Sequence, residues 1–167
     1  FFESSKDSPW FKDTIFIFTA DHGNQTFYPF YQKTINRFAN PLMIYKSESD
    51  LIGVDNRLSS HMDILPTVAD LLNYPDEFRS WGRSLISDMD KNGFVINYFS
   101  GGSYFIMDEN YICVHNGEKA IGYYEIEDKN LEKNIIHRRN QKMIDLERKC
   151  DLFLENYFNT LISRSSN

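Results

Sequence analysis

Cysteines and long apolar runs are both scarce in this 167-residue sequence. The two cysteines, Cys113 and Cys150, lie outside any Cys-x-x-Cys or Cys/His pattern typical of a zinc site. A disulfide between them and a pair of buried free thiols are both compatible with the sequence. No apolar run approaches the roughly 18–20 residues needed to span a bilayer, and no signal peptide opens the chain. We therefore predict no membrane span within these residues.

Basic residues are also fewer than acidic ones. There are 18 Lys and Arg residues against 24 Asp and Glu residues, which gives a net charge of −6. A nucleic-acid-binding protein usually needs a basic face, so this balance argues against a nucleic-acid partner. A small anionic substrate held by a metal ion stays compatible with it. The content of hydrophobic residues, 41%, is typical of a globular domain and argues against disorder.

The first half of the chain has the pattern of an α/β unit. Residues 14–20 form a continuous apolar run rich in β-branched and aromatic residues, which predicts a strand buried on both faces, as in a parallel sheet covered by helices. A second short buried strand is predicted at 41–45. Apolar residues then recur at helical spacing, with Pro66 in the first turn, which predicts a helix over about 63–73.

The second half has a different pattern. Four strand-like runs between 94 and 127 are separated by turn residues, including Asn116-Gly117, and predict a small antiparallel meander. Apolar residues spaced by threes and fours from Met143 to Leu161 predict an amphipathic helix of five or six turns, packed on the meander. We therefore divide the chain into residues 1–90 and 91–167.

The best candidates for chemistry are Asp21 and His22, at the carboxyl end of the first predicted strand, where ligands bind in open α/β sheets. A carboxylate oxygen and an imidazole nitrogen together suit Zn²⁺ or Mn²⁺. Adjacent side chains on a regular strand point to opposite faces, so the strand must already be breaking here. Gly23 permits that break through its backbone freedom. From spacing alone, a turn-capping Asp and a surface His remain the alternative.

Three further residues are candidates for the substrate side of the site. Asn24 follows the metal pair, His61 precedes the predicted helix, and Arg83 could reach a phosphate. The alternatives are helix entry or packing for His61 and a structural salt bridge for Arg83. Asp63 is expected to cap the helix or to bond to a neighbouring loop.

The remaining histidines, His115 and His137, are expected on the surface. A mild basic stripe lies beside Asp145 and Glu147 and consists of Arg138, Arg139, Lys142 and Lys149. We expect it to be a solvated helix face, with contact to lipid headgroups as the lesser alternative.

Four blocks resemble the alkaline phosphatase/sulfatase superfamily. They are, in order, DTIFIFTADHGN at 13–24, NPLMIY at 40–45, SSHMDILPTVADLL at 59–72 and WGRSL at 81–85. The first is similar to that superfamily's metal-binding strand and loop. The resemblance implies an alkaline phosphatase-like α/β/α sandwich, of which this chain would be the C-terminal portion, followed by the antiparallel meander and long helix.

The same resemblance implies a metal-dependent enzyme in which Asp21 and His22 are two of the metal ligands. The nucleophile and the first carboxylate ligand would lie upstream, so we expect a piece of a longer protein that is inactive in isolation and needs the upstream half of its own domain. The cofactor would be a divalent metal: Mn²⁺, Mg²⁺ or Zn²⁺, or Ca²⁺ in a sulfatase.

Within the superfamily, the sequence is most similar to lipoteichoic acid synthase-like proteins, on the lead-in SPWFKDT at 8–14 and the terminal meander and helix. This resemblance implies transfer of a phosphoglycerol-type headgroup from an anionic lipid. It also implies an extracytoplasmic protein, membrane-anchored in its intact form. The alternatives are a sulfuric ester hydrolase acting on a sulfate ester and a non-catalytic domain that keeps the fold.

Overall fold

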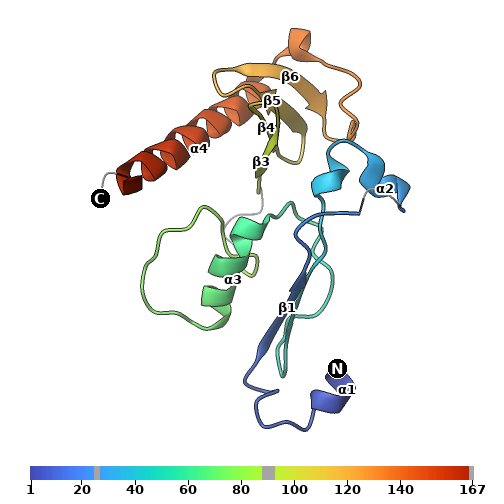
Figure 1. The fold of residues 1–167 in the computed structure, drawn as a ribbon, viewed down its shortest axis with the longest axis vertical. Helices are drawn as coiled ribbons and strands as arrows, with labels where there is room; N and C mark the ends of the chain where they lie inside the picture. Colours follow the sequence, from blue (N-terminus) through green and yellow to red (C-terminus); the bar gives the residue numbers. More distant parts are fainter. Residues whose placement is uncertain (25–26, 88–92, 166–167) are drawn as a thin grey trace. The chain divides into compact units, whose positions relative to one another are not determined.

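The computed structural model describes residues 1–24, 27–87 and 93–165 (Figure 1). It divides into two compact units. The first unit comprises residues 1–56 with 129–131, and the second comprises 57–128 with 132–167. The boundary predicted between residues 90 and 91 lies outside the described residues.

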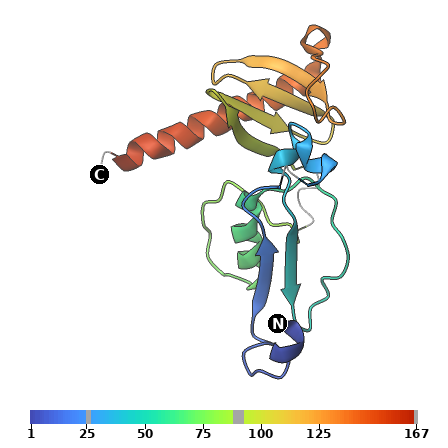
Figure 2. The same ribbon diagram turned by 45° about the vertical axis from the view of Figure 1, so that its right-hand side comes forward.

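The first unit is built around a two-stranded sheet. Its elements are α1 (Phe2–Ser5), β1 (Ile15–Thr19), α2 (Pro29–Gln32), a 3₁₀ turn η1 (Asn36–Phe38) and β2 (Leu42–Lys46). The two strands pair antiparallel, with Ile15 opposite Lys46 and Thr19 opposite Leu42 (Figure 2). Both strands predicted in this half of the chain are therefore present.

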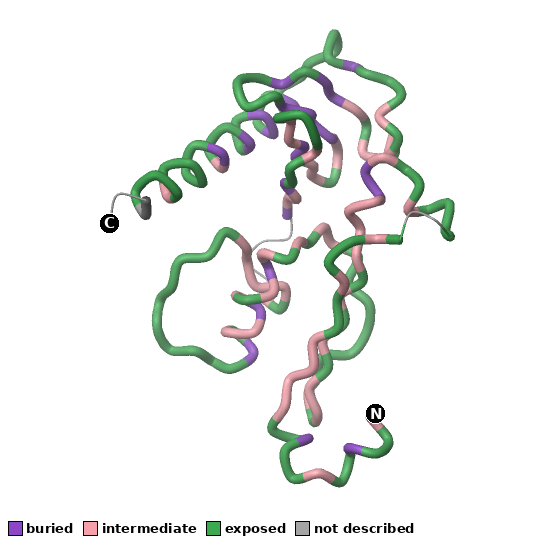
Figure 3. Tube along the Cα trace, in the orientation of Figure 1, coloured by how far each residue is buried: buried purple, intermediate pink, exposed green. Residues whose placement is uncertain are grey.

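The predicted burial of these strands on both faces is wrong within this chain. No residue of β1 or β2 is buried, and Figure 3 shows both strands as half-buried or exposed. One face is covered by aromatic rings: Phe2 packs 5.1 Å from Phe16 and 5.1 Å from Tyr45, between ring centroids. Phe11, which is buried, lies 5.2 Å from Phe16. These few side chains come from the segment before β1. They cover less of the sheet than a layer of helices would, so the strands are not fully buried.

The second unit begins with a short helical element. The 3₁₀ turn η2 (His61–Asp63) leads directly into α3 (Ile64–Leu71), which confirms the predicted helix. A capping box starts it: the Ser60 hydroxyl accepts the Met62 N–H at 3.2 Å, and the Asp63 carboxylate accepts the Ser60 N–H at 2.8 Å. Pro66 lies in the first turn of α3, where its missing N–H costs no helical hydrogen bond.

The antiparallel meander is also confirmed. It consists of β3 (Val95–Ser100), β4 (Ser103–Met107), β5 (Tyr111–His115) and β6 (Ala120–Glu125), hydrogen-bonded in that order. The β5–β6 turn places Gly117 at φ 93°, a left-handed conformation that side chains with a Cβ disfavour. This is the turn predicted from Asn116-Gly117.

The long helix α4 (Gln141–Ser165) packs on the meander, as predicted (Figure 1). At 25 residues it has about seven turns, slightly more than predicted. It follows the 3₁₀ turn η3 (Ile136–Arg138). Its buried residues Met143, Leu146, Cys150 and Leu154 join the core of the sheet. Among the described residues, no helix has both the length and the apolar character needed to cross a bilayer.

Candidate metal centre

The candidate metal pair lies just beyond the end of β1. The strand ends at Thr19, and Asp21 and His22 occupy a bend, so their side chains are free of the alternation imposed on a strand. His22 Nε2 lies 3.6 Å from Asp21 Oδ2, and the two side chains are 77% and 88% exposed. The predicted break of the strand therefore does bring an imidazole and a carboxylate to one place.

Local hydrogen bonds orient both groups. The His22 N–H donates to Asp21 Oδ1 at 3.0 Å, which leaves Oδ2 on the side of the imidazole. His22 Nδ1 lies 3.2 Å from the Gly23 carbonyl oxygen, which can only accept. The neutral ring therefore carries its proton on Nδ1 and keeps a lone pair on Nε2, the arrangement a metal-binding histidine needs.

The separation of the two atoms fits shared coordination of one ion. Two ligand atoms about 2.0–2.2 Å from a tetrahedral zinc ion lie about 3.3–3.6 Å apart. The observed 3.6 Å falls at the end of that range and is too long for a hydrogen bond between the two groups. Within the described parts of the chain, no third Asp, Glu, His or Cys joins them. The pair can supply two ligands of a metal site, and the remaining ligands must come from elsewhere.

Gly23 has a different role from the predicted one. Its φ lies outside the left-handed region, so backbone freedom is not what this position requires. The requirement is space: a Cβ here would lie 2.7 Å from Cδ1 of Tyr31 and 3.2 Å from the Ala39 carbonyl oxygen. The loop after β1 approaches the segment 31–39 too closely for any side chain.

The segment that precedes β2 holds this loop. Asn40 Nδ2 donates to the Asp21 carbonyl oxygen at 3.3 Å, and the Gly23 N–H donates to the Arg37 carbonyl oxygen at 3.3 Å. Asn40 Oδ1 is shielded from solvent and has no hydrogen-bond partner within the described residues. A buried acceptor without a donor is costly, and such groups often mark a missing water or ligand.

The three predicted substrate-side residues fall in different places. Asn24 is exposed and directly follows the pair. His61 and Arg83 belong to the second unit, and their participation in the site stays a prediction. Arg83 is half-buried, and its Nη2 donates to the Leu58 carbonyl oxygen at 2.9 Å. A Cβ at Gly93 would collide with this guanidinium group.

Asp63 has both of the structural roles considered for it. Besides capping the helix, its Oδ1 accepts the Arg83 N–H at 2.9 Å, and its carbonyl oxygen accepts the Thr67 hydroxyl at 2.6 Å. Thr67 in turn accepts the Leu85 N–H at 2.9 Å. Asp63 is only 5% exposed, and it joins the start of α3 to the loop after it.

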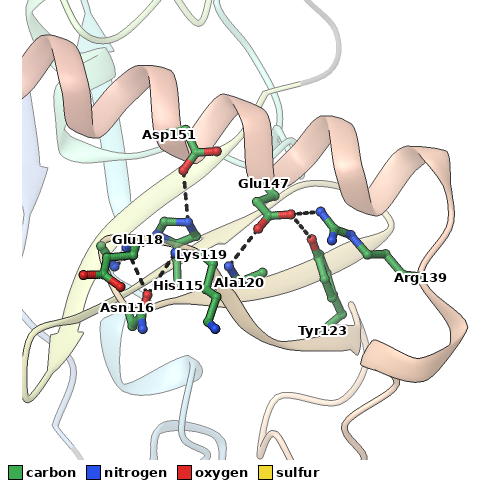
Figure 4. A network of polar contacts seen from close by, with 10 residues as sticks. His115, Asn116, Glu118, Lys119, Ala120, Tyr123, Arg139, Glu147 and Asp151 are labelled. Atoms are coloured by element: carbon green, nitrogen blue, oxygen red, sulfur yellow. Dashed lines mark hydrogen bonds and ion pairs between the residues drawn. The ribbon is translucent and has the colours of Figure 1, made fainter.

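A second polar cluster lies between the meander and α4, and sequence reasoning missed it (Figure 4). The expectation that His115 lies on the surface is wrong: it is fully buried at the end of β5. Its Nδ1 accepts the Gly117 N–H at 3.1 Å, and its Nε2 lies 3.0 Å from Asp151 Oδ1 without the alignment of a good hydrogen bond. His137 is exposed, as expected.

Glu147 is the other centre of this cluster. The basic residues beside it are exposed, as expected, but Glu147 itself is buried. One carboxylate oxygen accepts the Ala120 N–H at 2.8 Å, and the other accepts the Tyr123 hydroxyl at 2.8 Å and pairs with Arg139. Burial alone would raise the pKa of this carboxyl group, but the three donors outweigh it and hold the pKa below its usual range. Burial and the bond to Glu147 raise the pKa of Tyr123.

Both cysteines are free and buried, so the free-thiol alternative is the one observed. Burial, reinforced by the charge of Asp151, raises the pKa of the Cys150 thiol to about 12. Burial is also the largest cause of the raised pKa of Cys113. Neither thiol has the partly exposed, electropositive surroundings of a reactive cysteine.

Comparisons with known proteins agree with this description. Residues 1–74 match the family model described as Sulfatase. No curated protein matches the chain significantly. A solved structure that matches is a protein in the alkaline phosphatase superfamily from Vibrio parahaemolyticus, with a TM-score of 0.64 and 22% sequence identity. The match covers 96% of this chain and 38% of that protein.

The first finding shows that residues 1–74 are similar to the Sulfatase family, and the second shows that the chain shares its fold with part of an alkaline phosphatase superfamily protein. They also confirm the predicted fold class, with its α/β first part, antiparallel sheets and long C-terminal helix. The chain spans only 38% of the length of the relative that it matches, and the family model ends at residue 74. The meander and α4 thus lie beyond the match to the Sulfatase model.

Proposed function

We propose that this chain is the C-terminal part of a metal-dependent phosphotransferase that moves a phosphoglycerol-type headgroup from an anionic lipid. The observation that carries the proposal is the convergence of Asp21 Oδ2 and His22 Nε2, 3.6 Å apart, in the bend after β1. The match of residues 1–74 to the Sulfatase model supports an enzyme of this superfamily. The choice of a lipid headgroup rests on the resemblance of the SPWFKDT lead-in and of the terminal meander and helix.

In this proposal Asp21 and His22 hold a divalent cation: Mn²⁺, Mg²⁺ or Zn²⁺. When bound, such an ion supplies positive charge that stabilises the negative oxygens of the transferring group. Asp21 presents Oδ2 because its Oδ1 accepts the His22 N–H. His22 presents Nε2 because its Nδ1 donates to the Gly23 carbonyl oxygen. The nucleophile and the remaining ligands would come from the upstream half of the domain, and the chain alone would be inactive.

The second candidate is hydrolysis of a sulfate ester. It is favoured by the description of the family model that matches the part of the chain holding Asp21 and His22. The same two residues would then bind the metal, with Ca²⁺ as the expected ion. The upstream nucleophile would then be a modified cysteine, whereas a Thr or Ser is expected for a phosphotransferase of this superfamily. Either enzyme would be extracytoplasmic, and the phosphotransferase would be membrane-anchored in its intact form.

The test uses the intact protein with two substrates in separate assays, each run once with Mn²⁺ and once with Ca²⁺. One is a vesicle containing a lipid with a phosphoglycerol headgroup, and the other is an aryl sulfate. We expect release of diacylglycerol from the vesicles, and loss of that release in Asp21→Asn and in His22→Gln. Release of sulfate alone would support the sulfatase instead. Unchanged activity in both variants would remove the site assignment and favour a non-catalytic domain.

A further inference from the structure

We infer that Asn40 is a positioning residue for the Asp21–His22 pair, which deepens and rests on the function proposed above. Asn40 lies two residues before β2, 19 positions after Asp21 in the sequence. Its contribution is to fix the backbone that carries the two metal-binding side chains.

The geometry places one hydrogen bond on each side of His22. Asn40 Nδ2 binds the carbonyl oxygen of the Asp21–His22 peptide group, at 3.3 Å. The Arg37 carbonyl oxygen accepts the N–H of the His22–Gly23 peptide group, also at 3.3 Å. With both flanking peptide groups held by the segment 37–40, the backbone conformation of His22 is restrained, although its side chain is 77% exposed. A metal site needs ligands held within about 0.5 Å of their productive positions.

The holding segment is itself anchored. Ile35 is 2% exposed, and its N–H donates to the Lys129 carbonyl oxygen at 2.8 Å. The Thr34 hydroxyl donates to the Asn130 carbonyl oxygen at 3.2 Å. Residues 129–131 belong to the same compact unit as the segment. Through its hydrogen bond, Asn40 therefore links the loop that carries Asp21 and His22, which is largely exposed, to a segment that is itself anchored.

The second amide atom of Asn40 also needs an explanation. Its Oδ1 is shielded from water and receives no hydrogen bond within the described residues. An isosteric apolar side chain would avoid that cost, which is roughly 1–3 kcal/mol for a buried unpaired polar group. The presence of an amide here is accounted for by the bond that its Nδ2 makes to the site loop.

The test is metal binding by the intact protein, with Mn²⁺ alone as the probe in calorimetry and Co²⁺ as a spectroscopic probe of ligand geometry. The variants are Asn40→Leu, which removes both amide groups, and Asn40→Asp, which keeps the shape but replaces the donor. We expect a roughly tenfold loss of Mn²⁺ affinity in each, together with a changed Co²⁺ absorption spectrum, as for other residues that orient metal ligands. Asn40→Asp keeps the test decisive if the leucine variant does not fold.

Asn134 provides a matched control, because its Nδ2 also donates to a backbone carbonyl oxygen, that of Ile121, at 3.3 Å. Asn134→Leu should lower thermal stability without changing Mn²⁺ affinity or the Co²⁺ spectrum. If the Asn40 variants leave both metal readouts unchanged while Asp21→Ala abolishes binding, the inference on Asn40 is wrong and the proposed site stands. If Asp21→Ala also leaves binding unchanged, the proposed site itself is wrong.

Discussion

His22 Nε2 and Asp21 Oδ2 approach to 3.6 Å in a bend where both side chains face solvent. Two polar groups that are this exposed gain little stability from each other, because water screens their interaction. Their orientation is nevertheless fixed by hydrogen bonds to neighbouring backbone groups. We therefore expect substitutions at these two positions to have little effect on stability.

The first prediction separates binding from stability. His22→Ala should abolish high-affinity Mn²⁺ binding by the intact protein and leave its unfolding free energy in the absence of metal within about 0.5 kcal/mol of wild type. Calorimetry with Mn²⁺ and urea denaturation in EDTA measure the two quantities. His137→Ala, at another exposed histidine, is the matched control and should change neither. A large loss of stability in His22→Ala would instead make this histidine structural.

The second prediction concerns the close approach at Gly23. Gly23→Ala should cost about 1–3 kcal/mol, because its Cβ would lie 2.7 Å from the ring of Tyr31. Replacing Tyr31 by Ala in the same protein should restore part of that loss, since it removes the atoms that collide. A double-mutant cycle in urea denaturation measures the coupling, expected at roughly 0.5–3 kcal/mol. Additive effects of the two substitutions would contradict the steric account.

The third prediction follows from the lowered pKa of Glu147. A carboxyl group whose pKa is depressed on folding contributes stability above its unfolded pKa of about 4.3 and loses that contribution as pH falls through the lower, folded value. Glu147→Gln should therefore destabilise the protein at pH 7 by about 1–3 kcal/mol. The difference from wild type should shrink below pH 4. Urea denaturation across pH 3–7 tests this.

Glu155→Gln, at an exposed position on the same helix, is the control for Glu147 and should show little difference at any pH. A difference between wild type and Glu147→Gln that stays constant from pH 7 to pH 3 would show that the charge of Glu147 contributes nothing.

The fourth prediction concerns the buried cysteines. With the pKa of Cys150 raised to about 12, and that of Cys113 also raised, almost no thiolate exists at pH 8. An aromatic disulfide reagent should therefore label neither Cys113 nor Cys150 rapidly in the native protein at pH 8, and should label both in urea. Rapid labelling of the native protein would contradict the burial, and no labelling in urea would indicate a disulfide.

Much of the fold was predictable because local signals agree with the tertiary structure. Asn116-Gly117 fixes the β5–β6 turn, and the pattern from Ser60 to Pro66 fixes the start of α3. The burial of β1 and its direction relative to its partner strand were not predictable. A continuous apolar run does not indicate which strand pairs with it or which side chains cover it. Here β2 pairs antiparallel and aromatic rings cover one face.

The two residues of the candidate site could be predicted from the sequence, but the contacts that hold them in place could not. Asp21 and His22 were found because a carboxylate and an imidazole adjoin at a strand end. The contact from Asn40 and the space required at Gly23 depend on a segment that returns to the loop, which no local pattern encodes. His115 was missed for the same reason: its burial depends on α4, which contributes Asp151 36 positions later in the sequence.

The most direct test of the account is a crystal structure of the intact protein grown with Mn²⁺, using anomalous scattering at the manganese edge. We predict an anomalous peak bonded to an Asp21 carboxylate oxygen and to His22 Nε2, with the remaining ligands from residues upstream of this chain. A well-occupied manganese site elsewhere, with Asp21 and His22 still facing solvent, would contradict the assignment of this pair as metal ligands.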